Sequence, residues 1–341
     1  MAAIVLTDVC NLSCPPCLRP RTGSRAEPWS FPELQECLQE IREVGHTFLG
    51  YTGGEPSLWS DGDVTFPELL AATSRLGFEA MFVTNGWPFR TYDTGAALLD
   101  AYFESADGPL LVVVSVDLWH KGSWVEGRSP ALDALLQWRK AHEAARLEIE
   151  VSSLCCLDET RNLPTAAFSR YAEAGFDLGP PLVAMGPEMN DLAPRLCPTG
   201  TQKESLGAWG EVLRRRCGVS EQEWRDYSNS ELVGPCAAGE MLDLELDRQY
   251  WLCNDRAGKQ LRVATAGELT TEAIEACLDR NPLVRRFREV GVVEALRLCQ
   301  RQGDLLPPSV AEEALRTPHA YGHAGRAACG ICKSLPEEAF R

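Results

Sequence analysis

The sequence predicts an α/β protein, in which helices cover a parallel β-sheet, followed by a smaller C-terminal domain. Short apolar runs alternate with segments of helical periodicity through the first half of the chain. Two of these helices begin almost identically, with Ser30-Phe31-Pro32-Glu33 and Thr65-Phe66-Pro67-Glu68. Repeated strand–loop–helix units favour parallel pairing of the strands. In the last third, apolar alternation on both sides of Asp247-Arg248-Gln249 predicts a β-hairpin.

Six apolar runs are the expected strands of the parallel sheet. They cover residues 3–6, 47–51, 80–83, 110–116, 147–153 and 181–185. Helices are expected at about 30–45, from 65 onward, and at 96–103, 130–145 and 165–174. Six such units fit a partial (β/α)6 barrel. An eight-stranded barrel would need two more units before the composition changes after residue 187.

The first helix shows why these segments are expected to be helical. Ser30 and Glu33 form a capping box, and Pro32 fits the first turn. Apolar residues at helical spacing form one face: Leu34, Leu38, Ile41 and Val44. Cys37 shares that face, so we expect it to be a buried small side chain. Gly45 is expected to end the helix.

The domain boundaries follow from changes in the pattern. We expect the barrel over 1–187, a polar helical connector over 188–233, and a C-terminal hairpin and helix domain over 234–341. Within the last domain, 271–278 and 282–302 have helical character, and Cys277 and Cys299 are expected to pack in helix faces.

The composition restricts the class of protein. The chain has 341 residues, of which 45% are hydrophobic, which is ordinary for a soluble globular protein. A formal net charge of −16 argues against nucleic acid or an anionic membrane as the main partner. There is no apolar run of ~20 residues and no secretory signal, so a cytoplasmic protein is expected. Its 14 cysteines therefore indicate reduced thiols and metal sites.

Three cysteines, Cys10, Cys14 and Cys17, lie within eight residues directly after the first predicted strand. Thiolates this close together suit a soft-metal cluster, and three of them leave one iron of a [4Fe–4S] cube open. The competing interpretation is a zinc site, which would need a fourth ligand, and the nearest histidine is His46. The spacing resembles the signature of the radical S-adenosylmethionine (SAM) superfamily. That resemblance implies a partial barrel that holds a [4Fe–4S] cluster. The open iron of this cluster would bind the amino and carboxylate groups of SAM.

A second motif, Gly53-Gly54-Glu55-Pro56, follows the second predicted strand. Taken alone it is an ordinary turn. After the cysteine loop it resembles the GGEP-type sequence of the same superfamily, which implies that it holds the methionine amino group of SAM. Glycine allows close backbone approach, and a carboxylate can bind an ammonium group. Pro16 departs from the family, which often has an aromatic residue near the adenine.

Polar residues also follow the third and fourth strands, namely Asn85, Ser115 and Asp117. Active sites of βα folds lie at such strand ends. The stretch from Ser115 through Asp117 and His120 to Gly127 resembles the family's SxD…H…G pattern, which implies contact with SAM. Ser and Asp are also routine residues at helix entries, so this interpretation has a structural alternative.

Four further cysteines, Cys236, Cys253, Cys329 and Cys332, flank the predicted hairpin and form a Cys-x2-Cys pair near the end of the chain. Four thiolates would satisfy either a structural zinc ion or a second [4Fe–4S] cluster. The arrangement resembles the twitch, or shortened SPASM, domain of radical SAM enzymes. That resemblance implies an auxiliary cluster with no open iron.

The resemblance implies an enzyme that receives an electron from a flavodoxin or ferredoxin and cleaves SAM to a 5′-deoxyadenosyl radical. Within the superfamily, a single fully ligated auxiliary cluster resembles that of the dehydrogenases and epimerases that act on aminocyclitols and sugars. These members belong to natural-product (antibiotic) pathways. We therefore expect oxidation or epimerisation of a small polar substrate such as a sugar, aminocyclitol or nucleoside. The expected substrate contacts are Trp87, Trp119, His120, Glu150 and Ser152.

Other functions remain open at this stage. The cysteine loop begins about ten residues from Met1, so no peptide-recognition domain is expected before it, which argues against a peptide maturase. Sulfur transfer from the auxiliary cluster is a further alternative. A non-catalytic iron–sulfur or zinc-binding protein is the most distant one.

Overall fold

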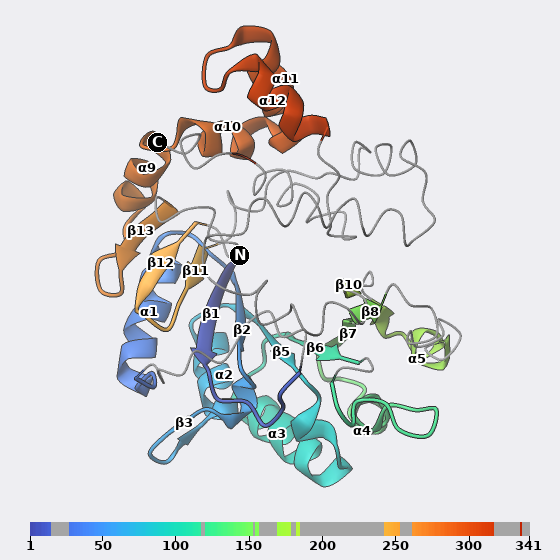
Figure 1. Cartoon of the computed structure of the whole chain (residues 1–341). Helices are drawn as coiled ribbons and strands as arrows, with labels where there is room; N and C mark the ends of the chain where they lie inside the picture. The colour runs from blue at the N-terminus through green and yellow to red at the C-terminus, as the bar shows by residue number, and fades with distance from the viewer. Residues whose placement is uncertain are drawn as a thin grey trace. The chain divides into compact units, whose positions relative to one another are not determined.

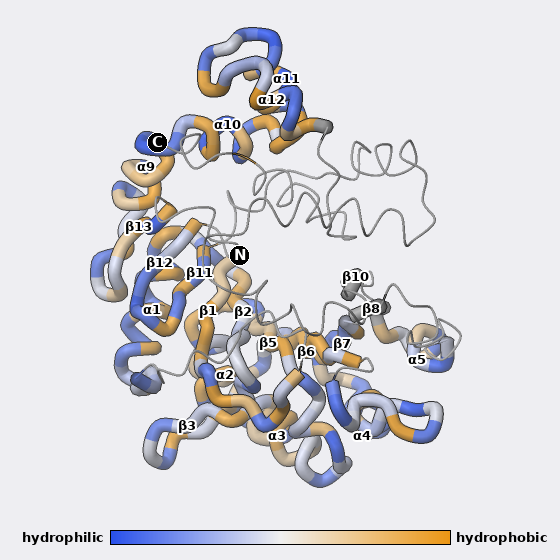
Figure 2. The backbone as a smooth tube through the Cα atoms, in the orientation of Figure 1, coloured by the Kyte–Doolittle hydropathy of each residue, from blue (hydrophilic) through white to orange (hydrophobic). Residues whose placement is uncertain are grey.

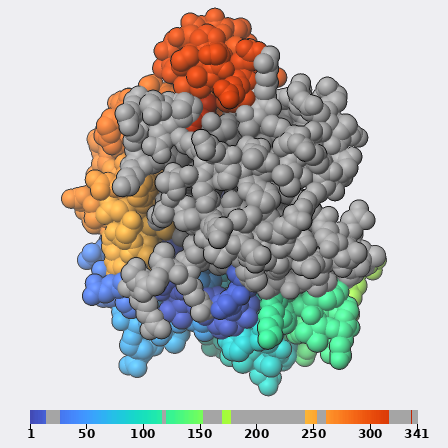
Figure 3. Space-filling view, viewed as in Figure 1, coloured from blue at the N-terminus to red at the C-terminus, as the bar shows by residue number. Residues whose placement is uncertain are grey.

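The computed structural model describes residues 1–14, 27–116, 120–152, 154–156, 169–178, 182–184, 242–252, 261–316 and 335. Figure 1 shows them in colour, and Figure 3 shows all atoms as spheres in the same view. The chain divides into two compact units, Met1–Cys197 with Leu244–Arg248, and Pro198–Asp243 with Gln249–Arg341. The domain boundaries at 187 and 233 stay predictions.

The first unit contains six strands of a nine-stranded sheet, and these six pair in parallel and follow one another in chain order. They are β1 (Ala2–Thr7), β2 (Phe48–Gly53), β5 (Glu79–Thr84), β6 (Leu110–Ser115), β7 (Leu147–Ser152) and β9 (Asp177–Leu178). Strands in chain order, joined by right-handed crossovers, place every connecting helix on the same face of the sheet. The predicted α/β class is confirmed, and this topology is consistent with a partial barrel.

Four helices connect the larger strands: α1 (Phe31–Glu43), α2 (Phe66–Arg75), α3 (Tyr92–Ser105) and α4 (Pro130–Ala141). α2 packs on α3 and α3 packs on α4, so consecutive helices lie side by side along the sheet (Figure 1). Figure 2 shows hydrophobic residues along β5 and β6 of the sheet. Buried aromatic rings pack between the helices and the sheet. The ring centroid of Phe66 in α2 lies 5.9 Å from that of Tyr51 in β2 and 5.2 Å from that of Phe82 in β5.

Shorter elements complete the first unit. They are η1 (Pro56–Leu58), β3 (Ser60–Asp61), β4 (Val64–Thr65), η2 (Trp87–Phe89), β8 (Leu154–Cys156), α5 (Ser169–Glu173) and β10 (Leu182–Ala184). The sixth position in the sheet differs from the prediction. The expected strand at 181–185 is β10, which pairs in parallel with β8, while the unpredicted β9 pairs with β7. With only two residues, β9 is too short to produce a periodic signal.

The two predicted capping boxes are confirmed. The Ser30 backbone N–H donates to the Glu33 carboxylate over 2.9 Å, and Ser30 Oγ accepts from the Glu33 backbone. Thr65 and Glu68 repeat this arrangement, with the Thr65 N–H 2.6 Å from Glu68 Oε2. α3 begins earlier than expected because Thr91 caps it.

The described C-terminal part of the chain contains β11 (Leu242–Leu244), β12 (Gln249–Trp251), β13 (Arg262–Thr265), α9 (Thr271–Asp279), α10 (Pro282–Val290), α11 (Val292–Gln302) and α12 (Pro308–Arg316). β12 and β13 pair antiparallel. The predicted helical segment at 282–302 is two helices, because Gly291 lies between them with φ of 83°. Cys277 and Cys299 are fully buried, and Cys37 of α1 is 2% exposed, as expected for packed side chains. No helix in the described ranges is long and apolar enough to cross a membrane.

Trp29 fixes the segment that leads into α1. Its side chain is 1% exposed, and its Nε1–H donates to the Val5 carbonyl of β1 over 3.0 Å. The Trp59 indole donates to the Trp29 carbonyl over 3.1 Å. The Arg248 guanidinium lies 4.1 Å from the Trp29 ring centroid and donates to the Glu27 carbonyl over 2.7 Å. The chain that returns from the cysteine loop is therefore held on β1.

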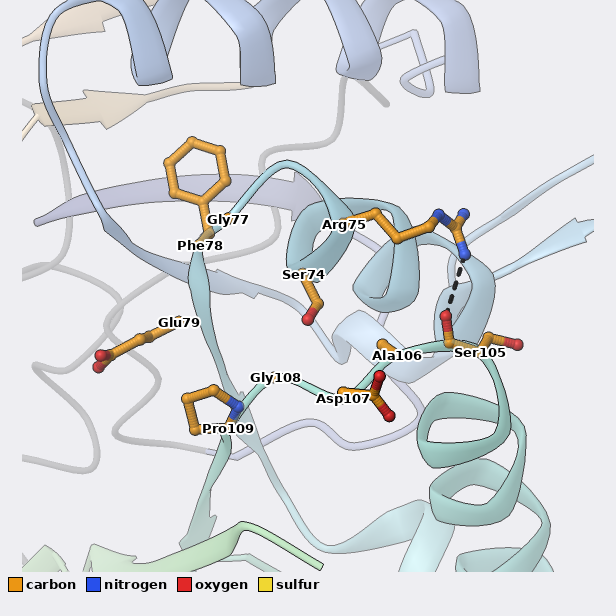
Figure 4. Close-up of a pocket in the computed structure, with 10 residues that line it drawn as sticks. All are labelled: Ser74, Arg75, Gly77, Phe78, Glu79, Ser105, Ala106, Asp107, Gly108 and Pro109. Atoms are coloured by element: carbon orange, nitrogen blue, oxygen red, sulfur yellow. Dashed lines mark hydrogen bonds between the residues drawn. The ribbon is translucent and has the colours of Figure 1, made fainter.

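A pocket of about 470 Å³ lies at the amino ends of β5 and β6, where Glu79 and Pro109 line it together with the ends of α2 and α3 (Figure 4). Arg75 donates to the Ser105 carbonyl there over 3.3 Å, which satisfies a carbonyl at the end of α3. The pocket lies at the amino ends of the strands, whereas the predicted site lies at their carboxyl ends. The hydrogen bond of Arg75 in this pocket serves to complete the end of α3.

Replacing Trp29 tests its role as a structural contact. Trp29→Ala should reduce the free energy of unfolding by about 3–5 kcal/mol, because it empties a filled core position. Trp29→Phe should reduce the free energy of unfolding by about 1 kcal/mol more than Trp87→Phe does, because Trp29→Phe also removes the hydrogen bond to the Val5 carbonyl. Trp87 is the matched control because it is 41% exposed. Urea denaturation of the full chain by circular dichroism measures the differences, and equal effects at the two positions would contradict this role.

Candidate functional site

The loops after β1 and β2 are in direct backbone contact. The Gly54 N–H donates to the Thr7 carbonyl over 2.6 Å, and the Glu55 N–H donates to the Val9 carbonyl over 2.8 Å. A Cβ atom built on Gly53 would overlap the Thr7 carbonyl oxygen, and one built on Gly54 would overlap that of Val9. Gly53 also has φ of 136°, which L side chains rarely adopt. Both glycines are therefore required by the neighbouring protein backbone, which sequence analysis did not anticipate.

Glu55 joins the end of β2 to the end of β5. Its side chain is 0% exposed, and its carboxylate accepts hydrogen bonds from Ser57 Oγ at 2.7 Å, Thr84 Oγ1 at 2.9 Å and the Asn85 N–H at 2.8 Å. Burial raises the pKa of Glu55, and these hydrogen bonds oppose that shift. The carboxylate oxygens thus contact donors of the protein itself, and binding of a ligand ammonium by Glu55 stays a prediction.

Asn85 follows β5 and reaches the cysteine loop. Its Nδ2 donates to Asn11 Oδ1 over 2.9 Å and lies 3.6 Å from Cys10 Sγ, within the range of an N–H···S hydrogen bond. Its Oδ1 accepts from the Trp87 N–H over 2.9 Å. The structure therefore brings Asn85, predicted as a SAM contact, onto the predicted cluster loop.

Cys10 and Cys14 are partly exposed and form no disulfide. Cys10 Sγ accepts a hydrogen bond from the Leu12 N–H over 3.4 Å in addition to the contact with Asn85. N–H donors directed at sulfur are typical of the cysteine ligands of iron–sulfur clusters, so this environment fits such a ligand. Cys17 lies outside the described residues. In the part of the chain that the structure describes, no three His, Cys, Asp or Glu residues form a metal site.

Three predicted residues lie on β6 and β7. Ser115 and Ser152 are register partners at the carboxyl ends of these strands, and Glu150 pairs with Val113 two residues earlier. Alternate residues of a strand share a face, so Glu150 and Ser152 lie on the same face of the sheet. Leu147, Ile149 and Val151 form the opposite, buried face of β7. A polar face at the carboxyl end of two strands is thus established.

The remaining predicted residues are more scattered or undescribed. Trp87 is 41% exposed, and the Arg90 guanidinium lies 4.5 Å from its ring. His120 is half-buried after β6. Six predicted site residues besides Cys17 lie outside the described residues: Asp117, Trp119, Cys236, Cys253, Cys329 and Cys332. Sequence analysis missed three hydrogen-bond partners in this site, namely Ser57 and Thr84 of Glu55 and Asn11 of Asn85. For Thr84, its place as a polar residue at the end of an apolar strand was the available signal.

Comparisons with known proteins match part of the chain. Residues 4–118 match the family model described as the Radical SAM superfamily. A GTP 3′,8-cyclase of Vibrio atlanticus (strain LGP32) is 34% identical over 88 residues, which are 24% of this chain and 25% of that protein. The chain thus spans only part of that relative.

Two solved structures have a distant overall likeness to the chain. Streptococcus suis SuiB bound to the precursor peptide SuiA is 14% identical with a TM-score of 0.48, and the match covers 80% of this chain and 65% of that one. anSMEcpe with bound AdoMet has the same identity and TM-score, with coverage of 80% and 76%. The family match covers the segment from β1 through β6, which carries Cys10, Gly53–Glu55 and Asn85, so this part of the chain is similar to the Radical SAM superfamily.

Proposed function

We propose that the chain is a radical SAM enzyme in which Cys10, Cys14 and Cys17 hold a [4Fe–4S] cluster. The observation that carries this proposal is the contact of the cysteine loop with Gly54 and Glu55 at the carboxyl ends of adjacent strands. When bound, the cluster and SAM supply a 5′-deoxyadenosyl radical that abstracts a hydrogen atom. A flavodoxin or ferredoxin would donate the electron.

The protein's own part in this proposal is to position SAM and the substrate. Gly53–Glu55 would line the methionine end of SAM through its backbone, and the buried Glu55 carboxylate would set the shape of that loop. Ser115, at the carboxyl end of β6, and Asp117 would lie near the ribose. In this arrangement SAM spans strand ends from β2 to β6, where βα folds place their ligands.

The substrate that best fits is a small hydroxylated or amino-bearing molecule, such as a sugar, aminocyclitol or nucleoside. The polar face formed by Glu150, Ser115 and Ser152 supports this, because a carboxylate and two hydroxyls suit ammonium and hydroxyl groups. We propose oxidation or epimerisation as the outcome. A second cluster held by Cys236, Cys253, Cys329 and Cys332 would accept the second electron of an oxidation.

Changing Cys10, Cys14 and Cys17 together to Ala tests the cluster assignment. The reconstituted wild-type protein should hold about eight irons, as two cubes, and the variant should hold about four. The variant should also form no 5′-deoxyadenosine from SAM under reducing conditions. Iron analysis and chromatography of the reaction measure both quantities.

Cys37→Ala is the control, because that buried thiol lies in α1 and should leave iron content and SAM cleavage unchanged. Zinc without iron in the wild-type protein would contradict both cluster assignments. Unchanged SAM cleavage in the triple variant would contradict the role of the cysteine loop.

Glu150→Gln tests the substrate class on a panel of aminocyclitols and amino sugars. Loss of a charge-assisted hydrogen bond should raise KM by about tenfold or more, because such a bond contributes about 1.5–3 kcal/mol. Glu148→Gln is the control, since Glu148 is exposed on the same face of β7 but lies two residues farther from its carboxyl end. Running the reaction of the wild-type protein in deuterated water distinguishes oxidation from epimerisation. A product two mass units lighter without deuterium supports oxidation, and deuterium in the product supports epimerisation. Equal KM values for the two variants would contradict the role of Glu150.

A further inference from the structure

We propose that Asn85 is a positioning residue that raises the reduction potential of the cluster by donating a hydrogen bond to Cys10 Sγ. The observation is the 3.6 Å distance between Asn85 Nδ2 and Cys10 Sγ. The inference rests on the proposed function, because it requires Cys10 to be an iron ligand. It assigns Asn85 to the cluster thiolate, whereas sequence analysis predicted a contact with SAM.

The orientation of the Asn85 amide follows from its neighbours. The Trp87 backbone N–H lies 2.9 Å from one end of the amide, and a backbone N–H can only donate. That end must therefore be the oxygen, which leaves the NH2 group facing Cys10 and Asn11. Asn11 Oδ1 accepts one of its hydrogens over 2.9 Å, and the second hydrogen is available to the sulfur.

The backbone of Asn85 is fixed as well. Its N–H donates to Glu55 Oε2 over 2.8 Å, and Glu55 is fully buried. The neighbouring Thr84 donates to the same carboxylate over 2.9 Å. A side chain attached to such a rigid strand end keeps its donor in place at little entropic cost. Asn85 is therefore placed to act on Cys10 in every turnover.

The effect on the cluster follows from charge. One-electron reduction adds a negative charge that is shared by the iron atoms and their thiolate ligands. An N–H dipole directed at a ligand sulfur stabilises the more negative, reduced state, so it raises the reduction potential. Cys10 Sγ accepts from the Leu12 N–H at 3.4 Å and from Asn85 Nδ2, and of these two donors only Asn85 can be removed by changing a side chain.

The test is a reductive titration of the reconstituted full chain with dithionite, without SAM, followed by electron paramagnetic resonance. Asn85→Ala removes the donor and should shift the potential of the Cys10 cluster to more negative values. Asn85→Asp keeps the shape but places a carboxylate beside the sulfur, so the shift should be larger. Affinity for SAM, measured on the oxidised protein, should stay unchanged in Asn85→Ala.

Asn11→Ala is the matched control, because it removes the Asn11 Oδ1 that accepts from Asn85 Nδ2 and lies 4.0 Å from Cys10 Sγ, while it keeps the Asn85 donor to Cys10. Its potential should not become more negative. An unchanged potential in Asn85→Ala, or weaker SAM binding with an unchanged potential, would overturn this inference while leaving the proposed function intact. A wild-type protein without an iron–sulfur cluster would instead refute the proposed function itself.

Discussion

The site depends on one steric constraint, which is the close approach of the β2 loop to the cysteine loop. The Thr7 and Val9 carbonyls accept hydrogen bonds from Gly54 and Glu55, and neither Gly53 nor Gly54 has room for a Cβ atom. Because β1 and β2 are adjacent parallel strands, their carboxyl ends already meet at one edge of the sheet. Because the two glycines have no Cβ atoms, the two backbones come into direct contact. This contact fixes the position of Thr7–Val9, the segment directly before Cys10.

A buried carboxylate extends this contact to the next strand. Removing Glu55 from water is costly, and hydrogen bonds from Ser57, Thr84 and Asn85 compensate for the lost hydration. Asn85 then returns to the cysteine loop through its side chain. The ends of β1, β2 and β5 are thus joined in a closed set of hydrogen bonds, which can hold the cysteine loop in a defined position before any ligand binds.

Local signals in the sequence predicted much of the fold. Ser30 with Glu33, and Thr65 with Glu68, predicted two helix starts because capping boxes are short-range motifs. The sequence could not predict β9, whose two residues are set by pairing with β7, nor the break at Gly291. It predicted Gly54 and Glu55 as site residues but not their contacts. Those contacts join residues far apart in the chain, as does the packing of Arg248 on Trp29.

The most direct test of this account is hydrogen exchange of the full-length Gly54→Ala variant. The new Cβ atom must displace the Val9 carbonyl, so the Glu55 amide should exchange faster and reconstitution of the Cys10 cluster should fail. Gly62→Ala is the control for backbone strain, because Gly62 has φ of 58° but a Cβ there has no neighbour within 4 Å. It should change neither quantity. Wild-type exchange at Glu55 together with normal cluster assembly in Gly54→Ala would contradict the account.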